Sequence, residues 1–306
     1  MVDGAPECNQ KRFQRADAFT TIDAQVHAYE RNHSGRPWMG AAIGRQEATG
    51  QQLVAAMDAA GVHGSILVSP FSTYRYDASY AVQVQAKHPD RFGIVKPVDP
   101  EAPSIAEVIS EWKSQPGAVG VRLILSGHVL AGIVKPGVER TLAAAAKQQM
   151  PVNLMCWGDL DQAASLAARH PDTQIVVDHL GIRQPWAPPA PEQPWAELPK
   201  VLALAAHPNV AIKITGACTL SHDGFPYRDI WDPLFRIFDA FGLERCLWGT
   251  DWTRAIALLS YEQGVDCFRK AGRLSERDRA MLMGGAAARI YDWSPNVDAP
   301  LSELPC

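Results

Sequence analysis

The feature that most constrains the fold of this chain is a series of eight short apolar runs, each followed by a segment with helical patterning. The runs span residues 21–27, 64–69, 92–98, 119–125, 151–156, 175–179, 210–215 and 246–248. Apolar strands without strict polar alternation are typical of parallel sheets that are buried on both faces. Eight strand–helix units in a chain of 306 residues predict an α/β fold, a single (β/α)8 TIM barrel.

Helices are predicted between and after these runs, and an open doubly wound sheet is the alternative architecture. The helices are expected at residues 47–60, 78–87, 104–112, 138–149, 160–169, 195–206, 230–241, 261–271 and 276–291. No G-x-G-x-x-G motif follows the first run, which disfavours a nucleotide-binding version of the open sheet. We expect a tail at 1–19, one barrel domain at 20–293 and a second tail at 294–306, with the Pro-rich segment 184–194 as an active-site loop.

Charge and composition exclude several classes of partner. The net charge is −4 and the pI about 6.1, which gives no reason to expect nucleic acid or an anionic membrane as a partner. No apolar run has the length of a membrane span, and the polar N-terminus lacks a signal-peptide core. The six cysteines show no C-x-x-C spacing, as in reduced proteins with free thiols. We therefore expect a cytoplasmic protein that acts on a small molecule, and homo-oligomer formation stays open.

Polar residues follow the strand ends, where a barrel carries its active site. Asp251 comes just after the last run and beside Gly249, which is expected to let the backbone turn tightly. No residue in the immediate neighbourhood is expected to neutralise Asp251, so its partners should come from other strands. The other strand-end candidates are Gln25, His27, Ser69, Tyr74, Arg75, Arg122, Trp157, His179, Arg183, Lys213 and Trp252.

Five motifs in this order resemble the amidohydrolase superfamily, in the branch that contains pyrone-dicarboxylate lactonase and the sugar lactonases. They are DAQVH at 23–27, VDHLG at 177–181, VAIKITG at 210–216, LWGTDW at 247–252 and GGAAARIY at 284–291. The resemblance implies that Asp251 is the general base and that His179 is catalytic or polarises a carbonyl. It places His27 in the strand-1 motif.

The strand-1 motif departs from the family pattern, which bears on metal binding. The family usually has His-x-His there, whereas this chain has Gln25 in the first position, and strand 5 ends in Cys156 and Trp157 rather than a histidine. An amide oxygen is a poor zinc ligand beside imidazole and carboxylate. A site without a cofactor is therefore favoured. If one divalent ion, zinc or manganese, binds, its ligands would be His27, His179 and Asp251, with Cys156 as an optional thiolate.

A lactone is the substrate class that best suits hydrolysis without a metal, because its leaving group needs less activation than that of an amide. Asp251 would take a proton from water, and His179, Lys213 or Arg122 would stabilise the oxyanion. A substrate carboxylate would be bound by Arg122, Arg183 or Arg75, and Trp38, Tyr74, Trp157 and Trp252 would wall the pocket.

Structural roles compete with these assignments. Asp251 could cap a helix, His179 could be a core histidine satisfied by Asp178, and Lys213 could pair with Asp178 or Asp251. Two other functions also stay open. One is a metal-dependent decarboxylase or hydrolase of the same superfamily, and the other is an inactive barrel that binds a small acid.

Overall fold

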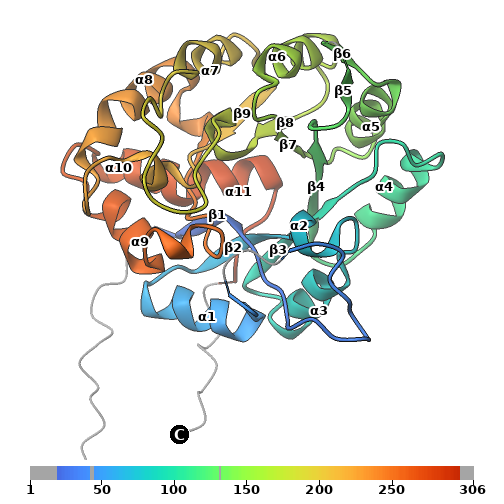
Figure 1. The fold of residues 1–306 in the computed structure, drawn as a ribbon, viewed down its shortest axis with the longest axis horizontal. Coiled ribbons are helices and arrows are strands. Elements are labelled where there is room, and N and C mark those ends of the chain that lie inside the picture. The colour runs from blue at the N-terminus through green and yellow to red at the C-terminus, as the bar shows by residue number, and fades with distance from the viewer. Residues whose placement is uncertain (1–18, 42–44, 131, 297–306) are drawn as a thin grey trace, which may run out of the picture.

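The predicted (β/α)8 barrel is confirmed by the computed structural model, which describes residues 19–41, 45–130 and 132–296 (Figure 1). Eight parallel strands follow one another around the sheet in the order β1-β2-β3-β4-β7-β8-β9-β10. They are β1 Ile22–Val26, β2 Gly64–Val68, β3 Phe92–Pro97, β4 Ala118–Ile124, β7 Val152–Met155, β8 Ile175–Val177, β9 Val210–Lys213 and β10 Cys246–Leu247. Each strand begins within one residue of the start of a predicted run and ends one or two residues before the end of that run.

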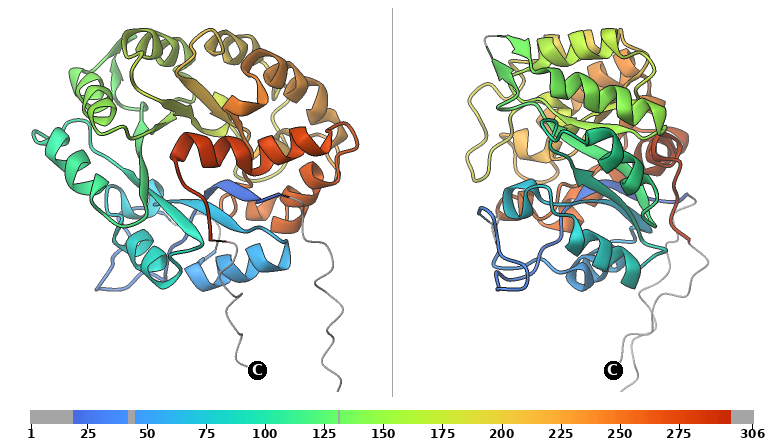
Figure 2. Two further views of the ribbon diagram at one scale, coloured as in Figure 1. Left: turned by 180° about the vertical axis from the view of Figure 1, so that it is seen from behind. Right: turned by 90° about the vertical axis from the view of Figure 1, so that its right-hand side faces the viewer.

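Helices surround the strands, as both faces of Figure 2 show. They are α1 Gly50–Ala59, α3 Ser79–Lys87, α4 Ile105–Lys113, α5 Pro136–Lys147, α6 Leu160–Arg169, α7 Leu198–Leu204, α8 Trp231–Phe241, α9 Tyr261–Arg269, α10 Glu276–Ala280 and α11 Ala286–Tyr291. The single helix predicted at 276–291 is divided by a π-helical turn, η6 Met281–Gly285. Capping boxes start α1 at Thr49 and α9 at Ser260, where each hydroxyl accepts a hydrogen bond from the third helical N–H.

Several short elements were not predicted because their sequences are too short to show a period. These are α2 Phe71–Tyr74, the hairpin of β5 Val129–Leu130 with β6 Ile133–Val134, and the 3-10 turns η1 Asp178–Gly181, η2 Ala217–Leu220, η3 Arg228–Ile230, η4 Leu243–Arg245 and η5 Ala255–Ala257. The turn η1 follows β8 directly and contains His179, and η2 begins at Ala217, shortly after β9 ends at Lys213.

The barrel closes where β1 meets the chain leaving β10. Ala24 N donates to Trp248 O at 2.9 Å, Asp251 N donates to Gln25 O at 3.0 Å, and His27 N donates to Trp252 O at 3.2 Å. These bonds continue past the two residues of β10, so the turn that contains Asp251 is held as part of the closing seam.

The core has two layers, and the inner one reaches the last helix. Side chains between strands and helices form the outer layer. Inside the barrel, strand residues such as Val68, Val176 and Leu247 pack with Ala287 and Tyr291 of α11. Helix α11 crosses in front of the strands in the rear view of Figure 2. It therefore closes the end of the barrel opposite the carboxyl ends of the strands.

The predicted tails lie almost wholly outside the described residues, as do Cys8 and Cys306. The four cysteines within the described ranges are free and buried. Among the helices of residues 19–41, 45–130 and 132–296, none has both the length and the apolar character needed to cross a bilayer.

Candidate active site

Asp251 lies in a strained turn directly after β10. Its φ is 54°, and His179 after β8 has a φ of 53°, a region that costs a non-glycine residue about 1–3 kcal/mol. The prediction that Gly249 makes the turn is wrong, because Gly249 is not among the residues with positive φ. Its lack of a side chain serves a close approach instead: a Cβ would come within 2.8 Å of Asp23 Oδ1 and 2.6 Å of Thr215 Cγ2.

The carboxylate of Asp251 lies between two histidines and an arginine. His27 Nε2 is 3.5 Å from Oδ1, and His179 Nδ1 is 3.5 Å from Oδ2. Arg254 Nε donates to the same Oδ2. The prediction that nothing nearby neutralises Asp251 is therefore wrong, because a guanidinium three residues along the chain folds back onto it.

These neighbours decide the ionisation of Asp251. Burial by itself raises the pKa of this carboxyl, but His179, Arg254 and His27 outweigh burial and hold the pKa well below its usual range. The site therefore contains an ionised carboxylate with no exposed surface.

Hydrogen-bond partners fix the proton on His179. Lys213 Nζ donates to Gln25 Oε1 at 2.8 Å, so the Gln25 amide nitrogen, 3.0 Å from His179 Nε2, must be the donor of that contact. Arg122 lies 3.3 Å from the same ring nitrogen, which therefore accepts. The proton of the neutral ring is then on Nδ1, 3.0 Å from Thr215 Oγ1. Burial lowers the pKa of His179 to about 3, so the ring is neutral near pH 7.

Asp178 organises the floor of the site. Its carboxylate accepts from Arg122 Nε at 2.7 Å and lies 3.1 Å from Lys213 Nζ. Burial raises its pKa, but Lys213 and Arg122 outweigh burial and bring the pKa to about 2. Asp178 thus satisfies Lys213 and Arg122 rather than His179. Two cations share one carboxylate, which leaves a positive charge beside His179 and Gln25.

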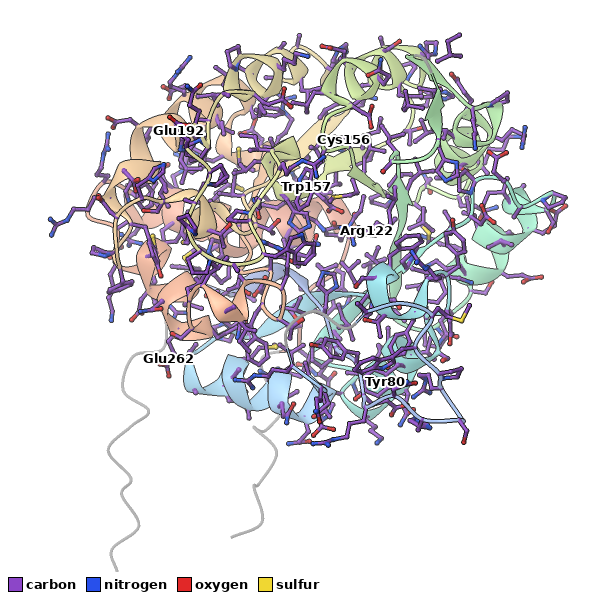
Figure 3. All side chains as sticks on the ribbon, viewed as in Figure 1. Tyr80, Arg122, Cys156, Trp157, Glu192 and Glu262 are labelled. Carbon is purple, nitrogen blue, oxygen red and sulfur yellow. The ribbon has the colours of Figure 1, made fainter. Side chains whose placement is uncertain are left out.

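Below this group, Tyr291 of α11 donates to Asn153 Oδ1 at 2.7 Å, and its ring centre is 5.8 Å from Lys213 Nζ. In Figure 3, Arg122 and Trp157 lie near the centre of the barrel, whereas Tyr80 and Glu262 lie at its periphery.

Asp23 ties the site to strand 1. Its carboxylate accepts from Thr250 N at 2.9 Å, Thr250 Oγ1 at 2.6 Å and Gln25 N at 3.1 Å. Burial raises the pKa of Asp23 to about 6, against the effect of these hydrogen bonds. Asp23 therefore fixes the backbone of Gln25 and of Thr250, the residue that precedes Asp251.

The predicted pocket residues lie at different depths. Trp157 packs against His179 with ring centres 5.6 Å apart, and its buried indole N–H has no hydrogen-bond partner among the residues that the structure describes. Ser69 donates to Asp77 O at 2.8 Å. Tyr74 accepts from Glu30 N at 3.0 Å, so Ser69 and Tyr74 hold loops.

The other predicted residues lie further out. Trp252 is buried against Tyr261, and Trp38 packs on Tyr29. Arg75 and Arg183 are exposed. A cavity of about 540 Å³ elsewhere, lined by residues such as Pro226, Trp231 and Cys267, includes none of the site residues. Asp251, Gln25 and Lys213 have no exposed surface.

The donor set does not fit a divalent metal as it stands. His27 donates from Nδ1 to Val68 O at 2.7 Å, so only its Nε2, which faces Asp251 Oδ1, is left to serve as a ligand. His179 Nε2 already accepts two hydrogen bonds, and Asp251 already carries Arg254. No group of three or more His, Cys, Asp or Glu residues within the described ranges has the arrangement to hold an ion. Cys156 is buried in the outer core, and burial raises the pKa of its thiol, so a thiolate ligand there is disfavoured.

Sequence reasoning missed four residues of the site: Arg254, Thr215, Gln184 and, as a functional residue, Asp23. Arg254 lies three residues after Asp251, and this spacing was the available signal. Gln184 donates to Thr215 O at 2.9 Å and accepts from Arg254 at 2.5 Å. Such bonds between loops leave no pattern in one sequence.

Comparison with known proteins places the chain in a family. The amidohydrolase family model matches residues 19–293. The L-fucono-1,5-lactonase of Burkholderia multivorans is 26% identical over 298 residues, covering 92% of this chain and 98% of that protein. An amidohydrolase from Burkholderia multivorans, crystallised with HEPES and also with zinc, is 25% identical with a TM-score of 0.74, covering 89% of this chain and 99% of that one.

A structure from Acinetobacter baumannii shares the fold. It is named a probable 2-pyrone-4,6-dicarboxylic acid hydrolase, contains citric acid, and is 21% identical with a TM-score of 0.71, covering 90% of this chain and all of that one. With its barrel and strand-end site, the chain belongs to the amidohydrolase family. Within that family it is a lactonase-like hydrolase.

Proposed function

We propose that the protein hydrolyses a small lactone that carries a carboxylate, with Asp251 as the general base. The observation that carries this proposal is an ionised, fully buried carboxylate held between His27 and His179 at the carboxyl ends of the strands. The L-fucono-1,5-lactonase and the 2-pyrone-4,6-dicarboxylic acid hydrolase support cyclic esters as the substrate class.

Water, the lactone and Asp251 account for every bond and proton in the reaction. Asp251 takes a proton from water while the water oxygen bonds to the lactone carbonyl carbon and the carbonyl electrons move to oxygen. Lys213 and Arg122, which share the single charge of Asp178, stabilise that oxyanion. The carbonyl then re-forms, the ring C–O bond breaks, and the ring oxygen takes the proton from Asp251.

Neutral His179 acts in this scheme as a fixed dipole rather than as an acid. Its Nδ1–H faces Thr215 and Asp251, which orients the carboxylate towards the incoming water. The surplus positive charge beside Gln25 favours an anionic substrate. We propose that the reaction needs no metal, because His179 Nε2 and Asp251 Oδ2 are already engaged by Gln25, Arg122 and Arg254.

A panel of lactones with and without carboxylates tests the proposal. Asp251→Asn is expected to lower kcat by roughly 10²–10⁴-fold, the usual contribution of a general base. The matched control, Asp172→Asn at an exposed loop position, is expected to keep the wild-type rate. Thermal melting of both variants shows whether they are folded.

Two results would contradict lactone hydrolysis by Asp251. Equal inertness of wild type and Asp251→Asn on every lactone, with retained binding of a small acid, would favour the binding protein. Release of carbon dioxide from an aromatic carboxylic acid, with no lactone opened, would favour the decarboxylase.

A further inference from the structure

Arg254 joins the turn of Asp251 to the loop at 182–197. Its Nε donates to Asp251 Oδ2, one terminal nitrogen donates to Pro185 O at 2.7 Å, and the other donates to Gln184 Oε1 at 2.5 Å. The guanidinium also lies 5.7 Å from the ring centre of Trp186. All three nitrogens of one buried guanidinium are thus engaged, at 3% exposure.

The backbone around Arg254 leaves room for this arrangement. Gly216 follows β9 with a φ of 69°, and a Cβ there would come within 2.5 Å of an Arg254 terminal nitrogen and would also overlap Gln184 Oε1. The contact between Arg254 and Gln184 therefore depends on a glycine at that position.

Access to Asp251 requires that some of these contacts break. Asp251, Gln25 and Lys213 have no exposed surface, and His179 is 2% exposed. Lys213 and Arg122 are held at the floor by Asp178. Trp186, next to Pro185, is by contrast 52% exposed. The loop side, where Arg254 binds, is thus the side from which a substrate can enter.

The pairing of Arg254 with Asp251 also opposes the proposed chemistry. A carboxylate that already accepts a charge-assisted hydrogen bond is a weaker base towards water. Its other oxygen has only His27 Nε2 at 3.5 Å. Asp251 therefore gains basicity when the guanidinium moves away. Removing one partner of a buried ion pair is costly unless another charge takes its place.

We propose that Arg254 determines specificity by exchanging carboxylates: it pairs with Asp251 in the free protein and with the carboxylate of an anionic lactone in the complex. This inference rests on the proposed function and deepens it. A bidentate guanidinium–carboxylate contact replaces the one that is lost, and the same movement releases the base. A lactone without a carboxylate offers no anion to which Arg254 can donate, so Arg254 stays paired with Asp251.

The test compares an unsaturated six-membered lactone bearing a ring carboxylate with the same lactone bearing a carboxamide. Wild type is expected to prefer the carboxylate in kcat/KM. In Arg254→Gln this preference is expected to fall at least tenfold, with the carboxamide rate raised because Asp251 is no longer paired with a guanidinium. Arg254→Lys keeps the positive charge but lacks the planar guanidinium. Its preference for the carboxylate should lie between that of wild type and that of Arg254→Gln. Arg236→Gln, at an exposed position of α8, is the matched control and should behave as wild type.

A parallel measurement separates this inference from the lactonase proposal. Binding of furan-2-carboxylate, followed by calorimetry, is expected to weaken at least tenfold in Arg254→Gln and to stay unchanged in Arg236→Gln. If Arg254→Gln melts as wild type yet loses both lactones equally, or binds furan-2-carboxylate as tightly as wild type, the exchange is overturned. If wild type opens neither lactone, the proposed function fails, and the binding difference alone then decides for or against Arg254 as the anion anchor.

Discussion

At the scale of single residues, Gln25 shows how one substitution changes a whole site. Its amide nitrogen donates to His179 Nε2, and its oxygen accepts from Lys213 Nζ. A histidine at this position could not serve both groups in the same way, because a neutral imidazole has one donor and one acceptor nitrogen at fixed angles. Gln25 thus fixes a neutral His179 and a charged Lys213 side by side.

Gln25→Met tests this role, because methionine has a similar length but offers no comparable partner. The variant leaves the buried ammonium of Lys213 and the His179 ring nitrogen each without one bond. We expect the free energy of unfolding, measured in urea, to fall by about 1–3 kcal/mol. Gln51→Met at an exposed position of α1 is the control. Equal stability of Gln25→Met and wild type would show that Gln25 is dispensable to the network.

At the scale of elements, the seam between β1 and the end of β10 positions the base. The backbone bonds of Ala24, His27 and Asp251 close the barrel, and Asp23 adds side-chain bonds to Thr250 across the same seam. Because Asp23 is fully buried, its pKa is raised to about 6, so it loses its proton at a higher pH than a surface carboxyl group does.

The seam gives a prediction about stability and pH. Burial raises the pKa of Asp23 from 3.8 to about 6, so its protonated form favours folding. The contribution of Asp23 to the free energy of unfolding is complete below pH 3.8 and is lost as the pH rises through about 6. The two limits differ by about 3 kcal/mol. The unfolding free energy of wild type minus that of Asp23→Asn should therefore decrease by up to that amount between pH 4 and 7.5.

This subtraction is needed because His179 acts in the opposite direction over part of the same range. Its pKa is lowered from 6.5 to about 3, so its contribution to stability grows as the pH rises through that interval. His179 is present in both proteins and cancels. Asp172→Asn serves as the matched control, and parallel curves for wild type and Asp23→Asn would contradict the assignment.

At the scale of the whole molecule, the structure predicts a barrel whose stability does not depend on a metal. Two of the three residues expected to bind an ion are paired instead, Asp251 with Arg254 and His179 with Gln25. A resident ion present at a hundredfold excess over its Kd would add about 2.7 kcal/mol to stability. We therefore expect the Tm and the lactonase rate to be unchanged after dialysis against EDTA and after addition of zinc. A fall in Tm of several degrees with loss of stoichiometric zinc or manganese would contradict this expectation.

The sequence alone determined the barrel and where its chemistry must lie. The eight strands are largely apolar runs with a few polar residues in or just after them, and such a local pattern can be recognised in a single sequence. Because parallel strands in a barrel end on the same face, His27, His179 and Asp251 could be assigned to one site from their positions alone.

Tertiary structure determined which groups are in contact, and it corrected the expectation that no nearby residue neutralises Asp251. The fold of the turn after β10 brings Arg254 back onto Asp251, and the floor pairs Asp178 with both Arg122 and Lys213. The three-residue spacing of Asp251 and Arg254 permits the first pairing without determining it, and the second joins residues from strands that lie far apart in the chain. Periodicity records which way a residue faces relative to the core, whereas the ionisation and hydrogen bonding of a buried residue depend on its neighbours in space.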